Sequence, residues 1–157
     1  MLTDAFMIRQ LQPYYANLKK RQVKSPKVYV RDSGLLHQLL GIDSLKSLFY
    51  HPKVGASWEG FVIEQILKNE PYDDIFFWAT HQGAEIDMII RRGDTLYGVE
   101  CKRTDNPRIT PSIRIALDDL NLKHVVIIYP GIQQFPLAKK VEAVPLQMVS
   151  KGESLFF

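Results

Sequence analysis

The stretch from residue 84 to residue 103 constrains the fold more than any other part of the chain. It holds two alternating runs, rich in β-branched residues, on either side of Gly93 and Asp94. Glycine at the first central position suits a two-residue type II′ hairpin turn. This turn sets the register of the two strands and places Arg92 opposite Thr95. The sequence therefore predicts an antiparallel hairpin with a fixed pairing.

The predicted register gathers charged side chains on one face of the hairpin. Asp87 falls opposite Glu100, and Glu85 falls opposite Lys102, so all four project to the same side. The other face is predicted to be apolar and to hold Ile86, Met88, Ile90, Tyr97, Val99 and Cys101. Two opposed carboxylates destabilise a sheet unless a divalent cation or a shared proton compensates. Solvated charges with a Glu85–Lys102 ion pair are the simpler alternative.

The composition favours a globular domain and excludes several kinds of protein. The chain has 157 residues, 46% hydrophobic and 24% charged, enough for one ordinary domain with a proper core. Its net charge of +3 permits a polyanionic partner without requiring one. The single cysteine, Cys101, excludes an internal disulfide and a multi-cysteine zinc site, and its alternation onto the apolar face indicates a core residue.

Targeting and nucleotide-binding signals are absent from the sequence. No run is long and apolar enough to cross a bilayer, and the first residues show no signal-peptide pattern. We therefore expect a cytoplasmic protein with no membrane partner. There is no Gly-x-x-x-x-Gly-Lys-Ser/Thr motif, so we expect no P-loop nucleotide site in this chain.

The N-terminal segment combines an apolar strand with a basic run. The strand, within residues 1–18, has no evident neighbour, so we expect the chain to be cut from a longer protein. Six cations follow closely: Lys19, Lys20, Arg21, Lys24, Lys27 and Arg31. Such a run is commonly a solvated loop, and contact with nucleic-acid phosphates is the functional alternative. A short strand and two short helices, the first capped by Asp32 or Ser33, complete the segment.

The clearest helix is predicted over residues 55–69, with Ser57 as a plausible N-cap. Its helical spacing leaves one polar gap, which holds Glu64 and Lys68. Glu59 falls inside the apolar arc instead. A carboxylate that faces a core is costly unless it is paired, protonated or bound to metal. The alternative is an acid near the helix N-terminus that bends out to water.

The remaining elements alternate between strands and one helix. A strand is predicted at 75–78, before the hairpin. Thr110 and Pro111 then start a helix as N-cap and first helical residue. Residues 125–129 form a continuous apolar run that is typical of a strand buried on both faces. One further short strand is predicted around residues 141–149.

The resulting order of helix, three strands, helix and strand resembles the PD-(D/E)XK nuclease superfamily. The resemblance covers residues 55–130 and rests on a helical Glu, a strand Asp and a Glu-x-Lys on the next strand, at Glu59, Asp87, Glu100 and Lys102. It implies an α/β class with a restriction-endonuclease-like mixed sheet, built on an αβββαβ core flanked by helices. The implied domains are an N-terminal extension at 1–52 and a nuclease-like domain at 53–157.

A second likeness covers nearly the whole chain. The run from Lys24 to Leu36, with the stretch from Gly55 to Val62, is similar to an uncharacterised domain found C-terminal to AAA-type ATPase modules in bacteria and archaea. It implies that the extension is the end of a winged-helix-like segment and that an ATPase module of the parent protein lies upstream. The Walker motifs of such ATPase modules are missing from this chain.

The nuclease resemblance also implies roles for particular residues. Asp87 and Glu100 would bind Mg²⁺ or Mn²⁺ with the backbone carbonyl of Cys101, and Glu59 would complete the acidic cluster. Lys102 would orient the attacking water or stabilise the developing charge. The residues proposed to contact DNA phosphates are Lys19, Lys20, Arg21, Lys24, Arg91, Arg92, Arg103 and Arg108.

Three functions remain open at the level of the sequence. The first is a Mg²⁺-dependent nuclease-like domain that acts on DNA. The second is a catalytically idle module that binds nucleic acid or protein and positions the ATPase. The third is a structural domain whose acids pair with Lys102 and nearby arginines, in which case Asp87→Asn should cost stability. A homo-oligomer is compatible with each of them.

Overall fold

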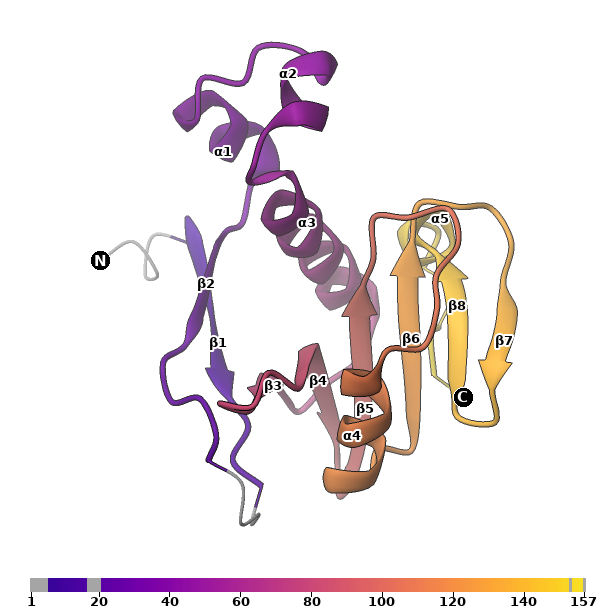
Figure 1. Ribbon diagram of the computed structural model, residues 1–157. Coiled ribbons are helices and arrows are strands. Elements are labelled where there is room, and N and C mark those ends of the chain that lie inside the picture. Colours follow the sequence, from indigo (N-terminus) through magenta and orange to yellow (C-terminus); the bar gives the residue numbers. More distant parts are fainter. Residues whose placement is uncertain (1–5, 17–20, 153, 157) are drawn as a thin grey trace.

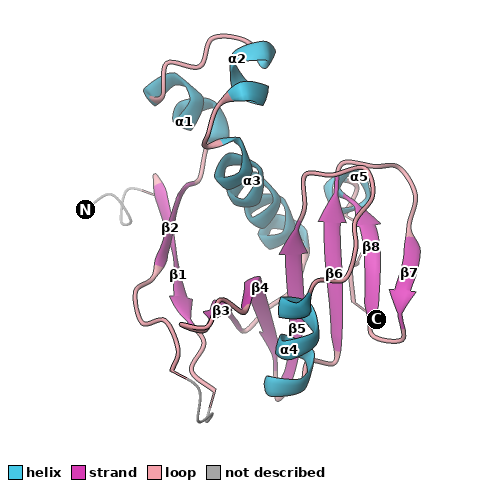
Figure 2. Ribbon diagram, in the orientation of Figure 1, coloured by secondary structure: helices cyan, strands magenta, loops and turns pink. Residues whose placement is uncertain are grey.

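The protein is a mixed α/β structure built on one sheet (Figures 1 and 2). The computed structural model describes residues 6–16, 21–152 and 154–156. The strands are β1 (Ile8–Pro13), β2 (Lys27–Val30), β3 (Asp74–Ala79), β4 (Glu85–Arg92), β5 (Thr95–Cys101), β6 (His124–Tyr129), β7 (Phe135–Ala138) and β8 (Val141–Pro145). The helices are α1 (Ser33–Leu39), α2 (Leu45–Tyr50), α3 (Val54–Asn69), α4 (Pro111–Asp119) and α5 (Leu146–Ser150).

The eight strands lie in the order β2-β1-β3-β4-β5-β6-β8-β7. β3, β4 and β5 form an antiparallel meander, and β5, β6 and β8 run parallel to one another. β1 pairs antiparallel with β2 and parallel with β3. The predicted order of helix, three strands, helix and strand is present as α3, β3, β4, β5, α4 and β6.

Helices cover both faces of the sheet. On one face α3 and α5 pack on a core cluster that includes Val62, Ile66, Met88, Val99, Val126 and Val149. On the other face α4, drawn in front of β5 in Figure 1, packs on a cluster that includes Ile86, Ile89, Ile113, Ala116, Val125 and Ile127. β6 is buried on both sides because its apolar residues alternate between the two clusters, as its sequence predicts.

The predicted hairpin register is confirmed, but the predicted faces are partly wrong. Arg92 pairs with Thr95 and Met88 pairs with Val99, and Gly93 has the positive φ of 57° that the turn requires. Ile86 was expected beside Met88, yet it packs in the cluster under α4. The reason is an irregularity in the β3–β4 pairing, which shifts the register by one residue and reverses the face.

Two predicted boundaries are corrected by the structure. α3 begins at Val54, so Ser57 is not its N-cap and lies buried inside the helix. The predicted strand at 141–149 ends at Pro145, where α5 begins, and β7 was missed. Thr110 caps α4 as predicted, since its hydroxyl accepts the backbone N–H of Ile113 at 3.3 Å. In the part of the chain that the structure describes, no helix is both long and apolar enough to span a bilayer.

The first strand does have neighbours, contrary to the expectation from the sequence. β1 lies between β2 and β3 in the sheet. Leu11 is fully buried in the cluster under α3, with Val62 and Phe77. Strands from the predicted extension at 1–52 therefore belong to the same sheet as the strands of the segment at 53–157.

Replacing Leu11 by Ala tests whether β1 belongs to the cooperative core. Loss of a fully buried leucine side chain is expected to lower the free energy of unfolding by about 2–5 kcal/mol. Val28→Ala, on the exposed part of β2, should change it by less than about 0.5 kcal/mol. Urea unfolding followed by circular dichroism measures both. An unchanged midpoint for Leu11→Ala would place β1 outside the cooperative unit.

Candidate functional site

Four acids and two lysines come together where α3 and β2 meet the paired strands β4 and β5. We call this group the acid cluster. Its members are Glu59 of α3, Glu85 and Asp87 of β4, Glu100 of β5, Lys102 just after β5, and Lys27 at the start of β2. Asp87 and Glu100 are buried, and the side chains of Glu59 and Lys27 are about four-fifths buried. The structure thus unites the four residues of the predicted catalytic set.

Lys27 is the central cation of the acid cluster. Its Nζ lies 2.9 Å from Oε1 of Glu59 and 3.5 Å from Oδ1 of Asp87, and it forms an ion pair with Glu85. Burial by itself would lower the pKa of Lys27, but the three carboxylates raise it above its ordinary value. The ammonium therefore stays charged. Sequence analysis placed Lys27 in a basic run and missed this role.

Tyr29 was also missed, and it holds Glu59 from the same strand as Lys27. The Tyr29 hydroxyl donates a hydrogen bond to Oε1 of Glu59. Burial and the Glu59 charge raise the pKa of Tyr29, so the phenol remains a donor. A Cβ at Gly60 would lie 3.2 Å from the Tyr29 ring, so this glycine lets β2 approach α3 closely. One sequence signal could have identified both residues: side chains alternate along a strand, so Lys27 and Tyr29 lie on the same face of β2.

Asp87 is held beside a second carboxylate. The backbone N–H of Cys101 donates to Oδ2 of Asp87 at 2.8 Å. Burial, followed by the charges of Glu100 and Glu59, raises the pKa of Asp87 to about 7 despite Lys27. The Cys101 side chain packs against the core under α3, as predicted, and burial raises the pKa of its thiol.

Only one of the two carboxylate oxygens of Glu100 has a partner among the described residues. Its Oε1 lies 2.6 Å from Nζ of Lys102, while its buried Oε2 has no hydrogen-bond partner among the described residues. Burial raises the pKa of Glu100, although Lys102 opposes the shift. In place of the Glu85–Lys102 pair of the simpler alternative, Glu85 pairs with Lys27 and Lys102 pairs with Glu100. Two ammonium groups face four acids, and the cluster is short of positive charge.

The donor chemistry of this cluster suits a hard cation, since carboxylate oxygens are the ligands that Mg²⁺ prefers. The unpartnered Oε2 of Glu100 supplies a free, buried oxygen. However, no three His, Cys, Asp or Glu side chains within the described ranges are arranged around a common cation position. The Lys27 ammonium lies between Glu59, Glu85 and Asp87 instead. The residues fit a divalent cation by their chemistry, and binding requires Lys27 to withdraw from Asp87.

Glu64 contradicts the expectation that it is a solvated acid. It is buried at 6% exposure and paired with Arg9 of β1 and Arg31 of the loop after β2. Nε of Arg31 lies 3.1 Å from Oε2 of Glu64. Hydrogen bonds and ion pairs with these arginines outweigh burial and lower the pKa of Glu64. The polar gap of α3 is thus the face on which β1 and β2 pack.

The structure places the proposed DNA-contacting cations in different regions. Arg91 pairs with Asp74, and Arg92 pairs with Glu70 and donates to the carbonyl of Pro71 at 2.8 Å. Both lie at the turn end of the hairpin, about 13 Å or more along the strand from Asp87, and the fold does not bring them to the acids.

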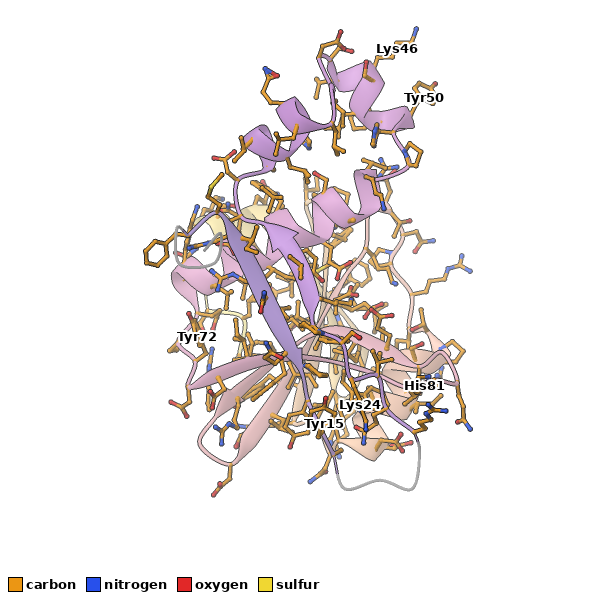
Figure 3. The ribbon with its side chains drawn as sticks, turned by 90° about the vertical axis from the view of Figure 1, so that its left-hand side faces the viewer. Tyr15, Lys24, Lys46, Tyr50, Tyr72 and His81 are labelled. Carbon is orange, nitrogen blue, oxygen red and sulfur yellow. The ribbon has the colours of Figure 1, made fainter. Side chains whose placement is uncertain are left out.

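The other proposed cations are exposed side chains. They are Arg21, Lys24, Arg103 and Arg108, and Lys19 and Lys20 fall outside the described residues. Arg103 directly follows Lys102 in the chain, and its guanidinium lies over the Phe49 ring. Figure 3 shows Lys24 together with Tyr15 and His81 at one end of the molecule. Of the proposed DNA-contacting cations within the described residues, these four remain as candidates for contact with a polyanion, since Arg91 and Arg92 pair with acids.

Replacing Asp87 by Asn is expected to stabilise the protein at pH 8 and to have little effect near pH 4. Between the ordinary carboxyl pKa of 3.8 and the folded value of about 7, the folded state keeps a proton that the unfolded chain has lost. Stability therefore falls as the pH rises through this window, and removing the charge should restore roughly 1–3 kcal/mol.

Urea unfolding between pH 4 and pH 8 measures this effect, with Asp94→Asn in the exposed turn as the control. The Asn side chain keeps an acceptor for the Cys101 N–H. A variant that is less stable than the wild type at pH 8 would show that the Asp87 anion is stabilised by Lys27 more than it is repelled by Glu100.

Replacing Lys27 by Met should have the opposite effect. Loss of the ammonium leaves three carboxylates uncompensated, so the free energy of unfolding at pH 8 should fall by roughly 2–4 kcal/mol. The loss should shrink toward pH 4, where the acids become protonated. Lys24→Met, an exposed lysine of the same run, is the matched control and should change stability little. If both variants changed the free energy of unfolding equally, Lys27 would not be the residue that compensates the carboxylates of the acid cluster.

Comparison with known proteins identifies a family whose function is unknown. Residues 54–149 match the family described as a domain of unknown function (DUF4143), and residues 1–46 match a second domain of unknown function (DUF8612). An uncharacterised protein of Mycobacterium tuberculosis and one of Mycobacterium bovis are each 49% identical over 148 residues, which is 94% of this chain. The chain spans about a third of their length, 34%. No solved structure matched the chain. The match over more than half of its residues shows that the chain belongs to the DUF4143 family, a domain found C-terminal to AAA ATPase modules in bacteria.

Proposed function

We propose that the acid cluster is the active site of a Mg²⁺-dependent, nuclease-like domain that hydrolyses DNA phosphodiesters. The proposal includes a restriction-endonuclease-like fold of the PD-(D/E)XK kind. One observation carries it: the cluster holds more acid than its two lysines neutralise, with Oε2 of Glu100 unpartnered and the pKa values of Asp87 and Glu100 raised. A purely structural ion-pair network is expected to be balanced and satisfied.

Asp87, Glu100 and the backbone carbonyl of Cys101 would hold the Mg²⁺ or Mn²⁺, with Glu59 completing the set. When bound, such a cation polarises the phosphate and lowers the pKa of a bound water. Tyr29 donates to Glu59 and fixes the position of that carboxylate. Lys27 contacts Asp87 at a longer distance than Glu59, so withdrawal from Asp87 breaks the weaker contact.

Lys102 is the residue that we propose to orient the attacking water. Its ammonium is held 2.6 Å from Oε1 of Glu100, and Glu100 raises its pKa although burial alone would lower it. A charged ammonium at this point would orient a water or stabilise negative charge on the phosphate as it is attacked. Arg103 and Arg108 follow Lys102 in the chain, and with Arg21 and Lys24 they are the proposed contacts to the DNA backbone.

A catalytically idle module is the second candidate, and the position of Lys27 favours it. An ammonium already lies among the carboxylates, and no metal-binding group of three is arranged in the described part of the chain. In this case the domain would bind nucleic acid or protein and position an attached AAA-type ATPase in the cytoplasm. The greater length of the mycobacterial relatives leaves room for such a module.

A plasmid-nicking assay with Mg²⁺ or Mn²⁺ tests the nuclease proposal. We expect nicking that a chelator abolishes. Asp87→Asn and Lys102→Met should each reduce the rate by about 100-fold or more, because each removes a group from the reacting centre. Asp94→Asn, in the exposed hairpin turn, should retain the rate of the wild type.

A mobility-shift assay on the same variants separates the two candidates. An idle DNA-binding module should retain DNA without metal, and Asp87→Asn should leave that binding intact. Arg103→Ala and Lys24→Ala should weaken it and reduce its dependence on salt. Metal-independent binding with no nicking by the wild type would reject the nuclease proposal in favour of the second candidate.

A further inference from the structure

α1 and α2 are short helices that bury no residue of their own. α1 has seven residues and α2 has six, and neither contains a buried position. Helices of this length are marginal in isolation, so packing against another surface must supply their stability. Within the chain both helices pack on α3, and α1 also contacts β2. Figures 1 and 3 show that both helices project beyond the end of the sheet, with Tyr50 and Lys46 at the outer edge.

Large apolar side chains are concentrated on this projection. The exposed ones on α1, α2 and their surroundings are Leu39, Leu40, Leu45, Phe49, Tyr50 and Phe61. Leu45 is 71% exposed and Tyr50 is 82% exposed. Scattered single apolar residues are normal on a protein surface, whereas a contiguous group marks an interaction site. We call this group the α1–α2 face.

A pocket lies at the base of the α1–α2 face, between α1, α2 and α3. Its volume is about 250 Å³, and Leu48, Phe49, Trp58 and Phe61 form much of its wall. The polar pair in its lining is satisfied internally, since His37 and Ser57 are hydrogen bonded at 2.7 Å. The buried indole Nε1 of Trp58 has no acceptor among the described residues. The wall of the pocket is therefore mainly apolar.

The charges around the face are mainly positive. Lys46, Lys53 and Arg103 are exposed, and Arg103 lines the pocket with its guanidinium 5.9 Å from the Phe49 ring centroid. The two nearby acids are used in capping and turn contacts. Asp32 accepts the backbone N–H of Leu35 at 2.7 Å, and Asp43 accepts the Ser47 hydroxyl at 2.9 Å. Hydrogen bonds from these neutral donors leave both carboxylates charged, so three cations against two acids leave a net positive charge of one around the face.

We propose that the α1–α2 face docks an amphipathic helix of a partner protein, whose apolar side chain enters the pocket and whose acidic residues face Lys46, Lys53 and Arg103. Helices commonly bind in this way, with apolar anchors at spacings of three and four residues. A second copy of this chain is a poorer occupant, because a symmetric pairing of the two faces would oppose like charges. The inference does not rest on the proposed nuclease activity.

A designed peptide tests the proposal directly. The probe is a helix of about 18 residues with leucines on one face and glutamates flanking them, and its control carries lysines in place of the glutamates. Trp58 lines the pocket, whereas Trp78 is fully buried and donates to Gln22 at 3.0 Å. A change in tryptophan fluorescence during titration therefore reports occupancy of the pocket.

We expect the acidic peptide to bind with a micromolar Kd and the basic peptide to bind at least about 10-fold more weakly. Tyr50→Ser and Arg103→Glu should each raise the Kd of the acidic peptide by about 10-fold or more. Tyr72→Ser, an exposed tyrosine far from Tyr50 in Figure 3, is the matched control and should bind like the wild type.

Three results would overturn the proposal. The first is equal binding of the acidic and basic peptides, and the second is no binding at about 1 mM, where ΔG would be weaker than about −4 kcal/mol. The third is a dimer in analytical ultracentrifugation that Tyr50→Ser dissociates, because the occupant would then be a second copy of the chain. Circular dichroism of each variant confirms that a loss of binding is not a loss of folding.

Discussion

The ammonium group of Lys27 is the contact on which the geometry of the acid cluster depends. It joins three carboxylates from two different elements, Glu59 of α3 and Glu85 and Asp87 of β4, to the edge strand β2. Tyr29, two residues further along the same strand, strengthens this link through its hydrogen bond to Glu59. Because Lys27 and Tyr29 come from the segment that matches one family and the acids come from the segment that matches another, the two segments share a single site. The position of β1 between β2 and β3 then has an electrostatic consequence, since it fixes the place of β2.

Much of the fold could be predicted from local signals in the sequence. Gly93 and Asp94 fixed the hairpin register, Thr110 and Pro111 fixed the start of α4, and the apolar run at 125–129 predicted a buried strand. The errors arose where pairing with a distant strand decides the outcome. The one-residue shift between β3 and β4 moves Ile86 to the opposite face. The sequence of β4 contains no signal that predicts this shift. Likewise, the sequence predicts an apolar strand within residues 1–18 but not its neighbours.

The acids of the site were easier to predict than their partners. The helical spacing of α3 placed Glu59 in an apolar arc, which required compensation for its charge, and the structure supplies Lys27 and Tyr29. The identity of those partners could not be read from the sequence, because a lysine within a run of cations has the composition of a solvated loop. Glu64 shows the converse problem. It lies in the polar gap of α3, yet it is buried and paired with Arg9 of β1 and Arg31 of the loop after β2. Burial of a charge is a property of tertiary packing, which amphipathic patterns alone do not specify.

The acid cluster and the pocket of the α1–α2 face both use residues of α3. Trp58 and Glu59 are consecutive residues of this helix; one lines the apolar pocket and the other accepts hydrogen bonds from Lys27 and Tyr29. Successive side chains of an α-helix point about 100° apart, so Trp58 faces the pocket beside α1 and α2 while Glu59 faces Lys27 and Tyr29. A partner side chain that enters the pocket therefore contacts Trp58 without contacting the acids. The balance within the acid cluster is set by its own groups, since protons and cations compete for the same carboxylates.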